Sequence, residues 1–143
     1  MSLLDAADGD PRSYVEIVDA LRQIASEPAA DGAQLWRRLA FNVLASNLDD
    51  HLRNHAVVYD GAGWRLSPAY DLNPVPAHVK QRELSTAITI DGDARASIAR
   101  AIAAAPEFFL THQAARGIAR DEVDRMASAF EHDEARDVLN DGP

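Results

Sequence analysis

Residues 47–74 read NLDDHLRNHAVVYDGAGWRLSPAYDLNP and decide how the chain is organised. Two short apolar runs, His55–Tyr59 and Trp64–Ser67, flank an Asp-Gly-Ala-Gly turn, so we expect them to form a β-hairpin. The segment before the hairpin, residues 46–54, is too polar for a core element and is predicted to be a loop. Beyond the hairpin, the prolines that begin at Pro74 rule out a helix.

Helical periodicity precedes this hairpin. A helix is predicted to begin at Ser13, with Glu16 completing a capping box, and to end at Pro28. A second helix is predicted from near Asp31. The apolar positions that should face the core in these two helices are Tyr14, Ile17, Val18, Leu21, Ile24 and Ala25, followed by Leu35, Trp36, Leu39, Ala40, Val43 and Leu44.

Further helices are predicted after the hairpin. Residues 77–92 should form a loop or weak strand, and Asp93 should cap a helix that ends before Pro106. Thr111 should open a longer helix whose buried face includes Ala115, Ile118, Ala119, Val123, Met126 and Phe130, and a last short helix is expected over 133–139. The predicted fold class is therefore mainly α with one central β-hairpin.

Length and composition set the remaining limits. The 143 residues fit one domain, with residues 1–12 expected to be a disordered lead or an expression remnant and 13–143 the folded part. Twenty-three acidic against 14 basic side chains give a formal charge of −9, which argues against direct nucleic-acid binding. The absence of cysteine excludes disulfides, thiolate catalysis and cysteine-ligated metals. We find no membrane span or signal peptide and expect a cytoplasmic protein.

The polar residues gather where the hairpin can bring them together. Because antiparallel strands place the start of the first beside the end of the second, the 49–54 loop should lie next to Asp71. Phosphoryl transfer needs a carboxylate base, with a carboxylate and an amide oxygen to hold Mg²⁺ on the phosphates. Asp49 precedes Asn54 by five residues, which is the spacing of the kinase catalytic loop, and Asp71 follows the hairpin.

The pattern Asn47-x-Asp49-Asp50-His51-x-x-Asn54, together with Leu66-Ser67-Pro68-Ala69-Tyr70-Asp71, resembles the C-terminal part of the HipA-like serine/threonine kinases, the toxins of bacterial toxin–antitoxin systems. The resemblance implies the helical C-terminal lobe of a kinase-like fold. It also implies that Asp49 is the catalytic base and that Asn54 and Asp71 bind Mg²⁺, with His51 ordering the loop at the ATP site. A protein substrate and an antitoxin protein are the implied partners.

The sequence contains no Gly-rich phosphate loop, and its only lysine, Lys80, lies in a proline-flanked loop rather than on a strand. The chain therefore resembles a kinase lobe without its nucleotide-anchoring lobe. We expect it to bind ATP–Mg²⁺ weakly at best and to transfer no phosphate by itself.

Two other functions fit the same residues. Asp50, His51, Asn54 and His55 could form the metal site of a hydrolase or nuclease, provided that residues 51–55 are helical and place both histidines on one face. Alternatively, the chain could be a non-catalytic helical module that docks an antitoxin.

Several conspicuous side chains have ordinary structural interpretations. Asp50 is expected to be a supporting or solvated carboxylate rather than a catalytic one, and His51 is expected to order the loop. The aromatic residues Trp36, Trp64 and Tyr70 are expected to anchor the core, and Arg37 and Arg38 to form a solvated helix face.

Overall fold

The computed structural model describes residues 12–75 and 83–126. In chain order it contains the helices and strands α1 (Tyr14–Ile24), α2 (Pro28–Leu44), β1 (Val57–Tyr59), β2 (Trp64–Leu66), α3 (Ile98–Ala103) and α4 (His112–Met126). Short 3₁₀ turns occupy Leu52–Asn54 and Ala105–Phe108. The predicted fold class, mainly α with one central hairpin, is confirmed.

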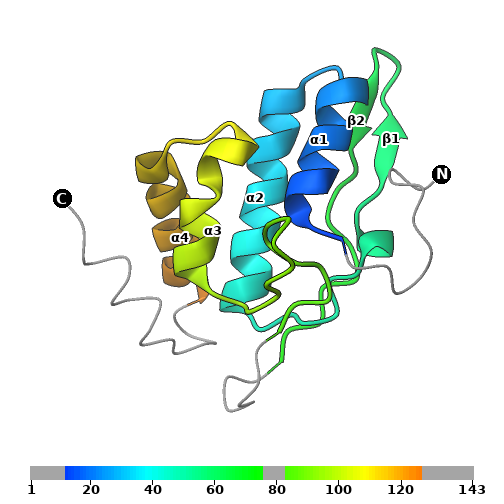
Figure 1. Ribbon diagram of the computed structural model, residues 1–143. Helices are drawn as coiled ribbons and strands as arrows, with labels where there is room; N and C mark the ends of the chain where they lie inside the picture. Colours follow the sequence, from blue (N-terminus) through cyan, green and yellow to red (C-terminus); the bar gives the residue numbers. More distant parts are fainter. Residues whose placement is uncertain (1–11, 76–82, 127–143) are drawn as a thin grey trace.

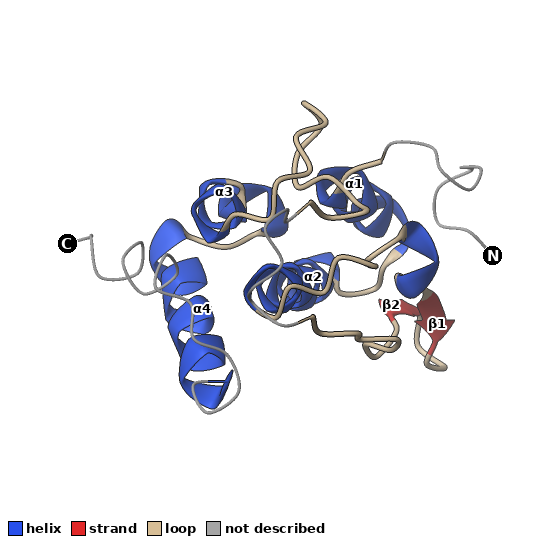
Figure 2. Cartoon of the chain, turned by 90° about the horizontal axis from the view of Figure 1, so that it is seen from below, coloured by secondary structure: helices blue, strands red, loops and turns tan. Residues whose placement is uncertain are grey.

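Helix α2 lies at the centre of the fold. It contacts α1 and the hairpin on one side and α3 and α4 on the other (Figure 1). Figure 2 shows α1, α2 and α3 nearly end-on, with α2 in the middle. Both predicted apolar rows of α2 are buried, and the Trp36 indole N–H donates to the Ala101 carbonyl oxygen at 2.8 Å. A helix surrounded in this way needs a broad apolar surface, which two adjacent rows provide.

The N-terminal helix begins as predicted but ends early. Ser13 and Glu16 form the expected capping box, and Tyr14 through Leu21 provide the buried face. The helix ends at Ile24, whose side chain is 40% exposed, so the prediction that Ile24 faces the core is wrong. Pro28 does not close this helix. It opens α2, three residues before the predicted start at Asp31, because a proline at the first helical position loses no hydrogen bond.

The hairpin is shorter than the two apolar runs suggested. Its strands pair antiparallel with Val57 opposite Leu66, and the Asp60 carboxylate accepts the backbone N–H groups of Ala62 and Gly63 in the turn. One buried side chain holds the hairpin to α2, because Asp31 accepts hydrogen bonds from the Arg65 guanidinium and the Leu66 N–H. This attachment fixes where the chain leaves β2.

The predicted capping role of Asp93 is wrong, because α3 begins five residues later with Ser97 as its N-cap. Asp93 instead binds Arg95 and Arg100, which keeps the chain in a turn before the helix. Helix α4 begins as predicted, since the Thr111 hydroxyl accepts the Ala114 N–H at its start.

Of the three aromatic residues predicted to anchor the core, one does so and two do not. Trp36 is fully buried, whereas Trp64 and Tyr70 are each 41% exposed and do not anchor the core. Trp64 packs edge-to-face on Tyr59 across the hairpin, with ring centroids 5.6 Å apart. Two short strands offer too little surface to bury an indole.

Predictions for Lys80, Phe130, residues 1–11 and the 133–139 helix lie outside the described residues. Within the described part, none of the helices has the length and apolar character needed to cross a bilayer.

Two helical glycines should respond oppositely to alanine. A Cβ at Gly32 in α2 would lie 2.8 Å from Phe109 Cδ2 and 3.2 Å from the Phe108 carbonyl oxygen, whereas nothing lies within 4 Å of the corresponding atom at Gly117 in α4. We expect Gly117→Ala to raise the free energy of unfolding by about 0.5–1 kcal/mol through helix propensity. Gly32→Ala should lower it by about 1–3 kcal/mol through overpacking. Urea unfolding measures both, and a stabilised Gly32→Ala variant would contradict the close packing.

Candidate active site

The polar loop, residues 45–54, connects α2 to the hairpin and is folded by its own hydrogen bonds. Asn54 is buried, with 8% of its surface exposed, and its Nδ2 donates to the Asp49 carbonyl oxygen at 2.8 Å. The Asn54 N–H donates to the His51 carbonyl oxygen at 2.9 Å in the 3₁₀ turn. These bonds give the loop a fixed shape and orient the Asn54 amide with its nitrogen toward the loop.

Asp49 lies on the open side of this loop. Its side chain is 63% exposed, and the His51 Nε2 lies 3.7 Å from its Oδ1. The predicted base is thus accessible to a substrate hydroxyl, and the loop-ordering role of His51 stays a prediction.

The exit segment, residues 67–75, returns from β2 and lies against the polar loop. The Tyr70 hydroxyl donates to the Arg53 carbonyl oxygen, the Asn73 N–H donates to Asn47 Oδ1 at 3.3 Å, and the Val75 N–H donates to the Ala45 carbonyl oxygen at 3.2 Å. The hairpin therefore brings together the two segments that the sequence predicted to meet.

Asp71 occupies an unusual backbone conformation in the exit segment. Its φ is +55°, in the left-handed region that Asp and Asn tolerate better than most residues. Its Oδ1 accepts the Asn73 side-chain N–H at 3.0 Å, and the residue is exposed. Its carboxylate is available to a cation.

A chain of hydrogen-bonded, buried polar side chains connects the polar loop to α1 and α2. The Tyr14 hydroxyl donates to Asp50 Oδ2 at 2.8 Å and accepts from Asn42 Nδ2 at 2.8 Å. Asn42 Oδ1 then accepts from Asn47 Nδ2 at 2.9 Å. Sequence reasoning missed Tyr14 and Asn42 as site-supporting residues. The available signal was a polar atom at the apolar face of each helix, which burial makes costly unless it is hydrogen-bonded.

Asp50 is a scaffold carboxylate. Its Oδ1 also accepts the Ser85 N–H at 2.7 Å and the Thr86 N–H at 3.3 Å, and only 1% of the residue is exposed. Burial raises the pKa of Asp50 to about 6, against the opposing effect of its hydrogen bonds from Tyr14, Thr86 and Ser85. Of the two roles expected for Asp50, these contacts agree with a supporting carboxylate, and its burial shows that a solvated one is wrong.

The geometric premise of the hydrolase alternative is wrong. His51 and His55 flank a single 3₁₀ turn, so they do not share one face of an α-helix. His55 is buried edge-on against the Tyr14 ring at 5.1 Å, and burial together with the nearby Arg38 guanidinium lowers the pKa of His55 to about 4. Among residues 12–75 and 83–126, no three His, Asp or Glu side chains are close enough to hold a metal ion together.

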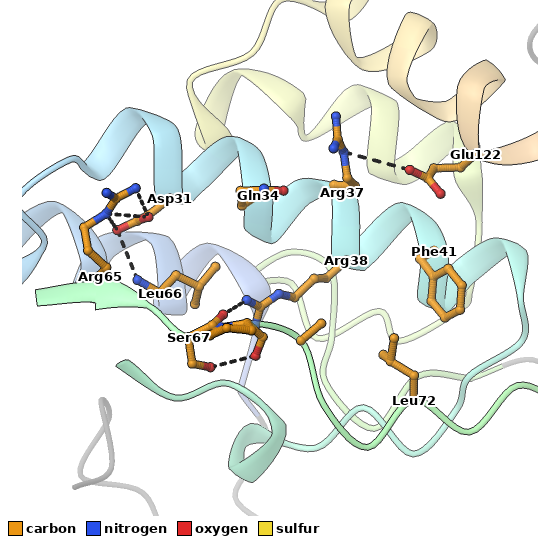
Figure 3. Close-up of a pocket in the computed structure, with 12 residues that line it drawn as sticks. Asp31, Gln34, Arg37, Arg38, Phe41, Arg65, Leu66, Ser67, Leu72 and Glu122 are labelled. Atoms are coloured by element: carbon orange, nitrogen blue, oxygen red, sulfur yellow. Dashed lines mark hydrogen bonds and ion pairs between the residues drawn. The ribbon is translucent and has the colours of Figure 1, made fainter. Parts of the chain in front are cut away.

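Arg37 and Arg38, adjacent residues of α2, lie in different environments. Arg37 is exposed and lies 3.9 Å from Glu122 of α4, as expected for a solvated face. The same prediction is wrong for Arg38, which turns inward and donates to the Ser67 carbonyl oxygen at the start of the exit segment. Both line a pocket of about 570 Å³ between α2, the exit segment and α4 (Figure 3). Burial lowers the pKa of Arg38 from its usual value.

The predicted magnesium ligands, Asn54 and Asp71, fit a hard cation. Because the Asn54 nitrogen is occupied by the Asp49 carbonyl, its Oδ1 is the atom left for a metal. One amide oxygen and one carboxylate are a suitable protein contribution for Mg²⁺, which keeps several waters and takes further oxygens from phosphates.

Comparison with known proteins identifies the family. The family model described as "HipA-like C-terminal domain" matches residues 1–132. This chain belongs to that family. The resemblance of its sequence to HipA-like proteins is thereby confirmed.

Two similar proteins come from Sinorhizobium fredii and are named as kinases. "Putative kinase Y4mE" is 33% identical over 67 residues, which cover 47% of this chain and 16% of that protein. "Putative kinase Y4dM" is 34% identical over 116 residues, which cover 71% of this chain and 26% of that protein. The HipA-like domain described here thus spans about a quarter or less of the length of these relatives.

Asp50 and His55 should give the HipA-like domain opposing pH dependences of stability. With a folded-state pKa of about 6 against the usual 3.8, Asp50 keeps its proton better when folded, so its contribution falls as the pH rises from 3.8 to 6. His55, at about 4 against 6.5, binds its proton better when unfolded, so its contribution rises as the pH rises from 4 to 6.5.

In the natural chain the opposite effects of Asp50 and His55 on the pH dependence of the unfolding free energy largely cancel. Variants that remove one of the two groups separate these effects. In His55→Gln, stability should fall as the pH rises from 4 to 6, by up to about 1.4 kcal/mol per pH unit. In Asp50→Asn, it should rise over the same range. Urea unfolding at several pH values measures both slopes, and parallel profiles for the two variants would contradict the assignment.

Proposed function

We propose that this domain is the C-terminal catalytic lobe of a HipA-like protein serine/threonine kinase that transfers the γ-phosphate of ATP to a protein hydroxyl. Asp49 is the general base, and Asn54 and Asp71 hold Mg²⁺. The observation that carries the proposal is the hydrogen-bonded apposition of the polar loop, with its exposed Asp49 and amide-anchored Asn54, and the exit segment that bears Asp71. Family membership and the kinase names of the similar proteins support it.

In the proposed reaction, the hydroxyl oxygen of the acceptor attacks the γ-phosphorus while its proton passes to the Asp49 carboxylate. The bond between the γ-phosphorus and the β–γ bridging oxygen breaks, and ADP leaves with that oxygen. Mg²⁺, when bound, supplies positive charge that neutralises the phosphates. The exposure of Asp49 gives a protein hydroxyl access to it, and the His51 Nε2 lies 3.7 Å from its Oδ1.

The proposal assigns the remaining kinase parts to residues outside this chain. The sequence contains neither the pattern of a Gly-rich phosphate-binding loop nor a lysine on a predicted strand. The matched residues cover only 16% and 26% of the two similar proteins that are named as kinases. We therefore propose that an additional lobe of the intact protein anchors the nucleotide and that the isolated domain transfers no phosphate. An antitoxin partner is a further proposal from the family resemblance alone.

Removing the base should abolish most turnover. General-base assistance is worth about 10²–10⁴ in rate, so Asp49→Ala in the intact parent kinase should lower kcat by at least about 100-fold with nucleotide affinity nearly unchanged. Asp124→Ala removes an exposed carboxylate of α4 and serves as the control, with unchanged turnover expected. Phosphate transfer to a protein substrate is the measurement. Full activity of Asp49→Ala would refute its role.

Weakening the metal ligand should act on nucleotide binding instead. Asp71→Asn keeps the side-chain shape and an oxygen acceptor for Asn73 but removes the charge that favours Mg²⁺. In the intact parent kinase we expect ATP affinity to fall at least about 10-fold in the presence of Mg²⁺ and little in its absence. Calorimetric titration with and without the metal measures this difference. Equal losses under both conditions would contradict metal ligation by Asp71.

A further inference from the structure

The exit segment is attached to the polar loop at three described points, and one of them differs from the others. The bonds of Tyr70 and Val75 go to backbone carbonyl oxygens of the loop. The bond of the Asn73 N–H goes to the side chain of Asn47, which is 1% exposed. This attachment therefore depends on one buried side chain, which is itself held by a second hydrogen bond to Asn42.

The orientation of that amide is dictated from the core. The Asp50 carboxylate accepts from Tyr14, so the Tyr14 oxygen is left to accept from Asn42 Nδ2. Asn42 must then present its oxygen to Asn47 Nδ2, which leaves Asn47 Oδ1 as the acceptor for the Asn73 N–H. Each bond fixes the direction of the next. The chain of bonds thus runs from α1 through α2 to the backbone two residues after Asp71.

We propose that Asn47 is a positioning residue that, together with the Tyr70 and Val75 attachments, holds the two proposed metal-binding side chains, Asn54 and Asp71, at the separation that a metal ion needs. Asn54 belongs to the polar loop and Asp71 to the exit segment, and Asn47 connects the two through its Oδ1 and is locked in place through its Nδ2. This inference rests on the proposed function, because the separation matters only if Asn54 and Asp71 bind Mg²⁺. The tether itself does not depend on it.

The experiment uses the 143-residue chain with two NMR readouts. The first is the hydrogen-exchange rate of the Asn73 N–H, which reports the tether directly. The second is paramagnetic broadening by Mn²⁺, added alone as a substitute for Mg²⁺, at Asn54 and Asp71. In Asn47→Ala we expect Asn73 exchange to accelerate at least about 10-fold and the Mn²⁺ concentration needed for broadening at Asp71 to rise at least about 5-fold.

Two further variants separate positioning from loss of folding. Ser85→Ala removes another side-chain bond to the polar loop, the one from its hydroxyl to the Leu48 carbonyl oxygen at 2.7 Å, without touching Asn47. It should leave Asn73 exchange and Mn²⁺ broadening unchanged. If Asn47→Ala does not fold, Asn47→Ser replaces it, because its hydroxyl keeps a polar group at this buried position while the shorter side chain does not reach the Asn73 N–H.

The outcomes distinguish the inference from the proposed function. Faster Asn73 exchange with weaker Mn²⁺ broadening in a folded Asn47 variant supports the inference. Unchanged exchange, or faster exchange with unaltered broadening, overturns it. Absence of broadening at Asn54 and Asp71 in the unmodified chain overturns metal binding at this site, and with it the functional part of the inference, while the exchange rate still decides whether Asn47 is the tether.

Discussion

The buried carboxylate of Asp50 is the constraint around which this lobe is arranged. A carboxylate removed from water is costly unless its oxygens accept hydrogen bonds, and those of Asp50 take theirs from Tyr14 of α1 and from the backbone of Ser85 and Thr86. Three segments far apart in the sequence must therefore be buried together. The Thr86 hydroxyl adds a bond to the Asp50 carbonyl oxygen at 2.7 Å, so the polar loop is held by backbone as well as side chain. The position of the loop is a consequence of satisfying this one charge.

The division of labour between Asp49 and Asp50 follows from the same arrangement. Asp50 is held inward by its hydrogen bonds and is 1% exposed, whereas the neighbouring Asp49 lies on the open side of the loop, where its carboxylate is 63% exposed. A mobile loop could expose either residue. Here the oxygens of Asp50 accept hydrogen bonds from Tyr14, Ser85 and Thr86, so Asp50 cannot turn outward in place of Asp49. Two neighbouring carboxylates thereby acquire different environments without any difference in their intrinsic chemistry.

Local patterns in the sequence were sufficient to predict that helices α1 to α4 exist, though not all of their ends, and that the loop and the exit segment meet. The Ser13 and Glu16 capping box, the two apolar rows of α2 and the Asp60 turn depend on neighbours within a few residues, and each is present. Failures arose where particular side-chain contacts, rather than periodicity, decide. Arg38 turns inward because the Ser67 carbonyl needs a donor, and Asp93 is drawn from its expected cap by Arg95 and Arg100. Helical periodicity also could not predict the roles of Tyr14 and Asn42. A hydroxyl or amide on a buried face must have a hydrogen-bond partner, but the pattern does not tell which residue that partner is. The catalytic and metal roles of Asp49, Asn54 and Asp71 stay predictions.

The pKa of Asp50, raised to about 6, shows why geometry has to precede electrostatics when a base is assigned. Perturbed pKa values cluster at functional sites, and a carboxyl that titrates near neutrality has the property expected of a proton acceptor. Yet Asp50 is 1% exposed and both of its oxygens already accept scaffold hydrogen bonds, so a substrate hydroxyl has no path to it. The shift in its pKa comes from desolvation, as does the opposite shift at His55 on the other side of the Tyr14 ring. Asp50 and His55, whose pKa values burial shifts, therefore support the site rather than take part in proton transfer. Asp49 is the better candidate for proton transfer because it is the carboxylate that a substrate can reach.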